Sequence, residues 1–309
     1  MIDLIIRTVE QGIAFGLLAM GVYITFRILD FPDLTVEGSF PLGAAITAKF
    51  IVMGTNPFIA TIFALIAGGM AGIITGLINT KLKIAGLLAG ILTMTSLYSI
   101  NLRIMGKPNI SLLRERTIIN VIAGYIESMG LNSTYVSLLS FIIIIFTVKL
   151  LLDYFLYTEK GMSLRATGNN PVMIESLGVN TDVVKIMGLA LANGLVALSG
   201  SMIAQYQGFT DVGMGIGMIV IGLASVIIGE VVIRSSKIPL ATLGVIVGAI
   251  IYRLAIALAL QLGFAPTDLK IVTAVLVILS LGAPTLRKFM IQDEFAEHLM
   301  ERGATDADD

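Results

Sequence analysis

Apolar residues form eight runs along the chain, each about as long as a membrane-spanning helix. A helix needs about 20 apolar residues to cross the hydrocarbon core of a bilayer. The runs are Gln11–Leu29, Pro57–Asn79, Ile84–Ile104, Tyr135–Leu156, Thr181–Tyr206, Gly213–Ile233, Pro239–Gln261 and Thr267–Pro284. A shorter run, Gly38–Met53, predicts a broken or half-buried helix. The pattern therefore predicts an all-α fold, a polytopic transmembrane helical bundle with eight or nine spans.

The composition agrees with a membrane protein and argues against several kinds of site. Of the 309 residues, 56% are hydrophobic and 13% are charged, whereas soluble domains carry about 25% charged residues. The net charge of −1 gives no electrostatic reason to expect a nucleic-acid partner. Cysteine is absent and the single histidine, His298, lies in a polar tail, so we expect no disulfide and no metal site.

The sequence also lacks the motifs of an enzyme. The phosphate-binding motif G-x-x-x-x-G-K-S/T does not occur in it. Paired aspartates, a Ser/His pair and a zinc motif, which would indicate intramembrane proteolysis, are not found either. We therefore expect neither catalysis nor a cofactor on this chain. If ATP drives the protein, a separate chain must hydrolyse it.

Lysine and arginine predict which loops face the cytoplasm. The connections 79–84, 158–181 and 232–238 each carry two such residues, whereas 207–212 and 261–267 carry none. Cytoplasmic loops are enriched in lysine and arginine. We therefore expect the basic loops and the C-terminus in the cytoplasm and, with nine spans, the N-terminus outside. The connection 105–134 would be external although it is also basic.

The polar segment 158–181 carries the signals of one very short helix. Asn170 suits its N-cap, Pro171 its first position, and Gly178 a left-handed C-terminus. About two turns of helix are not stable alone in water. The helix would expose four apolar side chains, Val172, Met173, Ile174 and Leu177. We infer that it docks into a groove of another protein, as the coupling loop of a transmembrane domain over residues 1–288. An acidic cytoplasmic tail, residues 289–309, follows this domain.

A second polar segment lies beside the short apolar run and contains Pro32, Gly38 and Pro41, which interrupt helices. Interrupted backbone at membrane depth must face protein or a water-filled cavity. One interpretation therefore places four side chains near a translocation pathway: Asp33, Thr35, Glu37 and Ser39. The other is a surface loop in which Asp33 or Thr35 only caps the next helix.

Polar side chains also lie inside the apolar runs. Thr95, Tyr98 and Ser99 share one helix face, and Tyr98 shares a face with Asn101. Asn193 and Gln205 lie in the run after the short helix. The pathway candidates in these runs are Thr95, Tyr98, Asn101, Asn193 and Gln205. The alternative is that such groups only form hydrogen bonds between helices, each contributing about 0.5–2 kcal/mol.

Two stretches, 16–43 and 194–222, are similar to each other. Each consists of a helix, an interruption and a glycine-containing apolar segment, with Phe31–Asp33 and Phe209–Asp211 as the interruptions. On the predicted topology the two helices run in opposite directions. This arrangement is typical of the inverted repeats of transporters.

The segment Leu164–Asp182, LRATGNNPVMIESLGVNTD, resembles the cytoplasmic coupling loop of ABC importer permeases of the branched-chain amino acid and ribose family. In that family the loop precedes a helix that ends in a small-residue run, here Asn193–Gly200. Gln11–Gly21 resembles the opening helix of the family. The resemblance assigns the contact with the ATPase to Arg165, Asn170, Pro171, Val172, Met173, Ile174, Glu175, Leu177 and Gly178.

The resemblance also implies the partners. It implies a bacterial cell-membrane complex of two permeases, in which this chain forms a homodimer, with cytoplasmic ATPases that bind ATP and Mg²⁺ and an external substrate-binding lipoprotein. The segment Leu34–Phe40 reads LTVEGSF and departs from the N-F-A-H-G-E form of branched-chain amino acid permeases. It is closer to the subgroup that works with lipoprotein-type binding proteins linked to aromatic amino acids. An amino acid, in particular an aromatic one, is therefore the expected cargo, and a sugar or nucleoside is the next option.

Two other functions are compatible with a polytopic bundle. A self-sufficient ion-coupled transporter or channel predicts acidic residues deep in several helices, and from the sequence only Glu230 qualifies, near a helix end. A scaffold protein without transport predicts no polar pathway.

Overall fold

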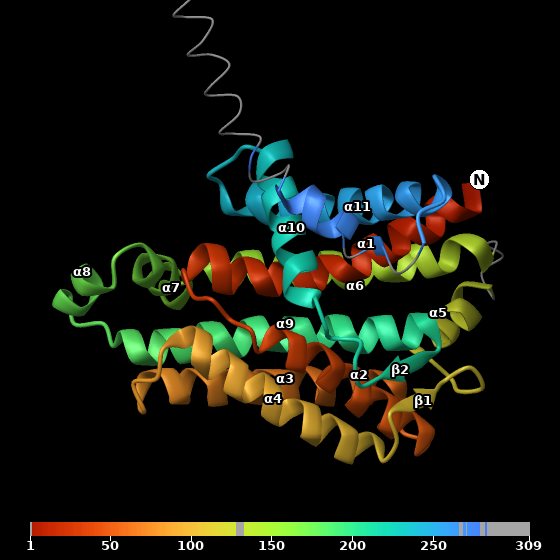
Figure 1. The fold of residues 1–309 in the computed structure, drawn as a ribbon, viewed down its shortest axis with the longest axis horizontal. Coiled ribbons are helices and arrows are strands. Elements are labelled where there is room, and N and C mark those ends of the chain that lie inside the picture. Colours follow the sequence, from red (N-terminus) through yellow and green to blue (C-terminus); the bar gives the residue numbers. More distant parts are fainter. Residues whose placement is uncertain (1, 128–132, 266–267, 270, 279–281, 283–309) are drawn as a thin grey trace, which may run out of the picture.

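The computed structural model describes residues 2–127, 133–265, 268–269, 271–278 and 282, and it is an almost entirely helical bundle (Figure 1). Its long helices are α1 (Ile2–Val22), α2 (Val36–Val52), α3 (Pro57–Thr80), α4 (Gly86–Met105), α6 (Ser133–Tyr157), α9 (Thr181–Gln207), α10 (Met218–Val232) and α11 (Ile238–Gln261). The shorter elements are the π-helix η1 (Tyr23–Ile28), β1 (Asn109–Ser111), α5 (Ile118–Glu127), α7 (Glu159–Asn169), α8 (Pro171–Ser176) and β2 (Phe209–Asp211). The all-α prediction is confirmed.

Six helices of the described part are long and apolar enough to cross a membrane. They are Leu4–Ile28, Pro57–Thr80, Gly86–Met105, Ser137–Tyr157, Thr181–Gln207 and Ile238–Gln261. Each corresponds to a predicted run and agrees with it to within a few residues, apart from the first, which begins seven residues before the predicted Gln11. The predicted run Thr267–Pro284 lies partly, and the tail 289–309 wholly, outside the described residues. The total of eight or nine spans stays a prediction.

Two predicted segments differ from the structure. The run 38–53 was expected to be a broken or half-buried helix, but α2 is continuous from Val36 to Val52 with Pro41 inside it, and 13 of its 17 residues are buried. That prediction was wrong, because a single proline removes only one helical hydrogen bond and neighbouring helices hold the rest. The run 213–233 was expected to span the membrane, but α10 begins only at Met218 and is 15 residues long. The glycines before it form turns instead.

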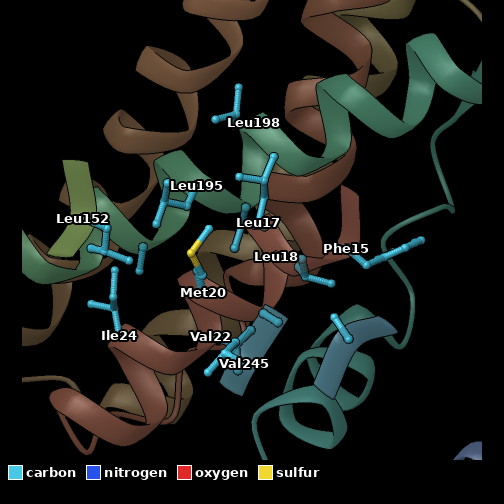
Figure 2. Close-up of a cluster of buried hydrophobic side chains, with 14 of the residues drawn as sticks. Phe15, Leu17, Leu18, Met20, Val22, Ile24, Leu152, Leu195, Leu198 and Val245 are labelled. Carbon is cyan, nitrogen blue, oxygen red and sulfur yellow. The ribbon is translucent and has the colours of Figure 1, made fainter. Parts of the chain in front are cut away.

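The core of the bundle surrounds α1. The apolar side chains of α1 pack against α6, α9 and α11 (Figure 2). Leu152 comes from α6, Leu195 and Leu198 from α9, and Val245 from α11. Helix α1 is buried by protein over most of its length, and its polar residues Thr8 and Glu10 are buried, whereas Arg7 near its start is exposed.

Glycines allow α9 to approach its neighbours closely. A β-carbon on Gly72 of α3 would lie 2.1 Å from the carbonyl oxygen of Leu189 in α9. A β-carbon on Gly43 of α2 would lie 1.9 Å from the carbonyl oxygen of Ala197 in α9. Real β-carbons do not approach so closely, so only glycine fits at these two crossings. Small residues are common where helices of membrane proteins touch, because they let the backbones approach closely.

The two ends of the bundle differ in character. The loop between α3 and α4 lies beside the start of α9, where the Lys81 and Lys83 ammonium groups are 3.8 and 3.9 Å from Asp182. Helices α7 and α8 project from this same end, whereas the β1–β2 pair and the N-terminus lie at the other (Figure 1). The basic loops therefore gather at one end, as predicted, and which side of the membrane that end faces stays a prediction.

The two stretches of the predicted repeat differ at their interruptions. Helices α1 and α9 run in opposite directions (Figure 1). However, Phe209–Asp211 is strand β2, paired with β1, whereas Phe31–Asp33 is irregular backbone between η1 and α2. The inverted repeat stays a prediction.

Candidate functional site

The short helix α8 is built as its sequence predicts. Asn170 caps it, with the Asn170 Oδ1 atom accepting a hydrogen bond of 3.0 Å from the backbone N–H of Met173. Pro171 occupies the first turn, and Gly178 follows the helix with a φ of +84°. The sequence did not predict α7, the 11-residue helix that precedes α8 and begins at the N-cap Thr158. The segment 158–181 is therefore two helices rather than a loop with one.

Three of the four apolar side chains of α8 are exposed. Val172, Met173 and Leu177 are 71%, 58% and 68% exposed. Ile174 was expected to be exposed as well, but that prediction was wrong, because it is only 9% exposed. Helix α8 contacts α7 and α9, so one of its faces is used within the chain. The Glu175 carboxylate accepts a hydrogen bond from the Thr181 hydroxyl at the start of α9, and Arg165 of α7 is exposed.

Helix α7 is attached closely to the end of the first membrane helix. A β-carbon on Gly168 would lie 1.8 Å from the carbonyl oxygen of Ile28, the last residue of η1. Leu164 of α7 is fully buried, and it belongs to the same core as Ile28 and Leu29. Helix α7 is therefore packed against the end of η1, where the irregular segment that leads to α2 begins.

Four of the pathway candidates lie in one buried hydrogen-bond network between α2, α3 and α9. The Asp33 carboxylate accepts from the Asn193 amide at 2.7 Å and from the backbone N–H of Thr35 at 2.9 Å. The Asn193 Oδ1 atom accepts from the Ser39 hydroxyl at 2.7 Å. The Thr35 hydroxyl is 2.7 Å from that of Thr75. All five side chains are at least 99% buried, so in this conformation the network joins helices and lines no open cavity.

The polar residues of α4 divide between its two faces. Thr95 and Tyr98 are exposed, as is Ser99, which confirms that these three share a face. Asn101 was expected to share a face with Tyr98, but it is fully buried, and its amide donates to the Gly38 carbonyl oxygen of α2 at 3.2 Å. Tyr98 and Asn101 are three positions apart on a regular helix and are therefore neighbours on its surface. They differ in burial, because only Asn101 belongs to the buried i, i+4 row that begins at Thr93.

Gln205, near the end of α9, is a buried amide with several partners. It accepts a hydrogen bond of 2.9 Å from the backbone N–H of Ile118 and donates one of 2.9 Å to the Thr61 hydroxyl. It thereby joins α9 to α3 and to the start of α5. Gln205 also lines the cavity at this end of the bundle.

Glu37 links the starts of the two short membrane helices. Its carboxylate accepts a hydrogen bond of 3.0 Å from the backbone N–H of Gly217, the N-cap of α10. Pro41 has no backbone N–H to donate to the Glu37 carbonyl, and Gly215 packs so closely against the Glu37 carbonyl oxygen that a β-carbon at Gly215 would lie 1.9 Å from it. A carboxylate is stabilised near helix N-termini, and Glu37 lies at the N-termini of both α2 and α10.

A cavity of about 790 Å³ is lined by residues of α1, α5 and the C-terminal end of α9. The ends of these helices that line it lie at the end of the bundle opposite α8 (Figure 1). Its lining includes Arg7, Glu10, Gln205, Tyr206 and Phe209. The Tyr206 hydroxyl donates to the Glu10 carboxylate at 2.9 Å. The sequence analysis missed Arg7 and Glu10, although two charges inside the first hydrophobic helix were a visible signal.

Buried carboxylates are more numerous than the sequence indicated. Glu10, Asp33 and Asp153 are 4%, 1% and 6% exposed, whereas the Glu230 side chain is 40% exposed and pairs with Arg27 at 2.7 Å. Burial inside the bundle does not measure depth in a membrane, so the expectation that only Glu230 is a deep acidic residue stays a prediction. Each of the three buried carboxylates has a protein hydrogen-bond partner. Within the described residues, no group of three His, Cys, Asp or Glu is arranged to bind a metal ion.

Comparison with known proteins decides the family. The sequence profile of the family described as branched-chain amino acid transport system / permease component matches residues 4–281. The chain belongs to this permease family. A "Tyrosine transport system permease protein" of Clostridioides difficile strain R20291 is 45% identical over 282 residues, which cover 91% of this chain and 92% of the relative.

Other members of the permease family are more distant. The uncharacterised protein RP368 of Rickettsia prowazekii is 35% identical to this chain, and the aligned residues cover 91% of this chain and 98% of RP368. The ribose import permease protein RbsC of Haemophilus influenzae is 24% identical, over 81% of this chain and 75% of its own. The chain is thus a multi-pass membrane permease of an ABC importer. Permeases of this family work with ATPase and binding-protein partners. Family membership decides against the ion-coupled and scaffold alternatives.

Proposed function

We propose that this permease imports an amino acid, with L-tyrosine as the first candidate. The relative that transports tyrosine is 45% identical over nearly the whole of both chains. The single observation that carries the ATP-driven mechanism is the pair of helices α7 and α8 at one end of the bundle. Their free surface bears Val172, Met173 and Leu177, and such an apolar cluster fits a groove of a cytoplasmic ATPase.

In this mechanism α8 moves when the ATPases close. ATP and Mg²⁺ bind to the ATPases, and this chain contributes no covalent chemistry. The close contact of Gly168 with Ile28 would pass the movement to η1. From there it would reach α2, where the network of Asp33 and Asn193 joins α2 to α9. The permease then alternates between two states with different contacts to its partners.

The remaining parts of the assembly follow from the same proposal. Two copies of the chain form a homodimer in the bacterial cell membrane, with the C-terminus in the cytoplasm. An external lipoprotein delivers the cargo at the end where the cavity and the β1–β2 pair lie. The pathway assignment of Asp33, Thr35, Glu37, Ser39, Thr95, Tyr98, Asn101, Asn193 and Gln205 stays a prediction.

Reconstitution of the whole importer tests this function. The permease, its ATPase and its binding lipoprotein are placed in liposomes, and uptake of labelled L-tyrosine is measured beside L-leucine and D-ribose. We expect uptake of tyrosine that needs ATP inside and the binding protein outside. Uptake that instead needs only a proton or sodium gradient would contradict the proposal, and ATP-driven uptake of ribose alone would contradict the cargo.

A further inference from the structure

We propose that the cavity at the N-terminal end of α1 binds the zwitterionic head of an α-amino acid. Arg7 would bind the carboxylate and Glu10 the ammonium group. The inference rests on the proposed import of an amino acid and adds the residues that recognise it. Neither residue belongs to the segments that the sequence analysis selected.

The two charges have the spacing that such a ligand requires. Arg7 and Glu10 are three residues apart on α1 and both line the cavity, so they lie on the same helix face, with β-carbons about 5–6 Å apart. An α-amino acid carries its carboxylate and its ammonium group on one carbon. Both partners must therefore lie within reach of one small ligand, as they do here.

The opposite charges remain available for a ligand. Among the described residues, Arg7 and Glu10 form no ion pair with each other. Glu10 is 96% buried and directed by the Tyr206 hydroxyl at 2.9 Å, and the Tyr206 ring contacts Phe141 edge-on with the ring centres 5.4 Å apart. A buried carboxylate that is held in place by one hydrogen bond can still accept others.

The walls of the cavity suit the rest of an amino acid. Tyr206 and Phe209 provide aromatic surface, and Ile6 and Leu113 provide apolar surface. Its volume of about 790 Å³ falls within the range of about 300–1,000 Å³ that is usual for small-molecule sites. The cavity also lies at the end of the bundle away from α8 (Figure 1), where an external binding protein would release its cargo.

A neighbouring cavity shows why this one is preferred. About 450 Å³ in size, it lies on the other side of α1, against α11, and its lining includes Arg7 and Arg253 but no acidic residue. It fits an anion rather than a zwitterion. Only the larger of the two has both signs of charge together with aromatic walls.

The absence of cysteine from the sequence provides a direct test by protection of a thiol. Asn120 lines the cavity, and Asn120→Cys would report its occupancy in the permease–ATPase complex in lipid nanodiscs. The rate of modification by a maleimide is measured with L-tyrosine, with L-leucine, and with two analogues of tyrosine. Tyramine lacks the carboxylate and 3-(4-hydroxyphenyl)propionate lacks the ammonium group. Met53→Cys, 69% exposed on the protein surface and not part of the lining, is the control position.

We expect both amino acids to slow the modification of Asn120→Cys and neither analogue to do so at the same concentration. Arg7→Gln and Glu10→Gln should each weaken this protection at least about tenfold, because each removes a charge-assisted hydrogen bond. Glu10→Gln keeps an oxygen for Tyr206, so folding should survive. Arg103→Gln, an exposed arginine outside the cavity, should leave the protection unchanged.

The outcomes separate this inference from the proposed function. The inference is wrong if neither amino acid protects the thiol, or if both analogues protect it as well. It is also wrong if protection survives both Arg7→Gln and Glu10→Gln. Each of these results would contradict the inference even where ATP-driven uptake is found. If the amino acids protect the thiol but no ATP-driven uptake occurs, the site stands and the proposed function fails.

Discussion

Gly168 of α7 lies against the carbonyl oxygen of Ile28, and a β-carbon at Gly168 would be only 1.8 Å from that oxygen. The contact joins the proposed ATPase-binding helices to the end of the first membrane helix. Because backbone meets backbone, neither side can yield by changing a side-chain rotamer.

Gly168→Ala should therefore uncouple the importer. We expect α7 to shift away from η1, so that uptake falls by at least about tenfold while the ATPase stays bound. The comparison of uptake with ATP hydrolysis in proteoliposomes measures this. Gly69→Ala is the matched control, because its β-carbon would meet nothing closer than 3.5 Å. Equal uptake in the two variants would show that this contact does not transmit the movement.

Asn170→Ala should loosen α8 itself. The hydrogen bond from Met173 N–H to the Asn170 side chain is the side-chain cap of the α8 N-terminus. The loss of such a cap lowers the stability of a helix by about 1 kcal/mol. We expect faster hydrogen exchange of the backbone amides of residues 172–176 and weaker ATPase binding. Asn180→Ala removes the equivalent cap of α9 and should have less effect on exchange, since packing holds that 27-residue helix. If both variants exchange alike, the cap is not what orders α8.

Asn193→Ala should destabilise the bundle. The Asp33 carboxylate and the Ser39 hydroxyl would each lose a partner while buried, and each unsatisfied group costs about 1–3 kcal/mol. The thermal unfolding temperature in detergent should fall clearly. Asp33→Asn in the same variant should restore part of the loss, because it removes the buried charge, whereas additive losses would argue against a shared network.

Glu230→Gln should leave transport nearly unchanged. Glu230 pairs with Arg27 at 2.7 Å, but the two side chains are 40% and 62% exposed, and exposed ion pairs contribute only about 0–1 kcal/mol. We expect uptake within about twofold of the unmodified importer at any pH from 6 to 8. A loss of uptake, or the disappearance of a pH dependence that the unmodified importer shows, would indicate that this carboxylate carries a coupling proton.

The sequence predicts the repeating and local features of this fold well. Of the six described helices that are long and apolar enough to cross a membrane, five agree with their apolar runs to within a few residues. The N-cap, the first proline and the terminal glycine of α8 are Asn170, Pro171 and Gly178, as the sequence indicates. These features depend on hydropathy and on contacts between residues close in the chain. The permease family could also be recognised from the segment around α8.

Features that depend on distant contacts could not be predicted. Ile174 is buried, and the helix that carries it contacts α9 and also α7, which hydropathy does not reveal. Asn101 is fully buried, and its amide donates to the carbonyl oxygen of Gly38, which lies 63 positions earlier in the chain. Arg7 and Glu10 were missed because apolar neighbours dominate the average around them, and their cavity exists only once α1, α5 and α9 meet.

The central claim is that α8 binds the ATPase, and cross-linking from one position tests it most directly. Met173→Cys is treated in native membranes with short thiol–amine linkers, and the products are identified by mass spectrometry. Met173 is 58% exposed, whereas the adjacent Ile174 is 9% exposed, so Ile174→Cys is the matched control. We predict a strong adduct of Met173→Cys with the nucleotide-binding ATPase and little from Ile174→Cys. If Met173→Cys is accessible to a soluble maleimide but captures no ATPase with any linker length, the account of coupling through α8 is contradicted.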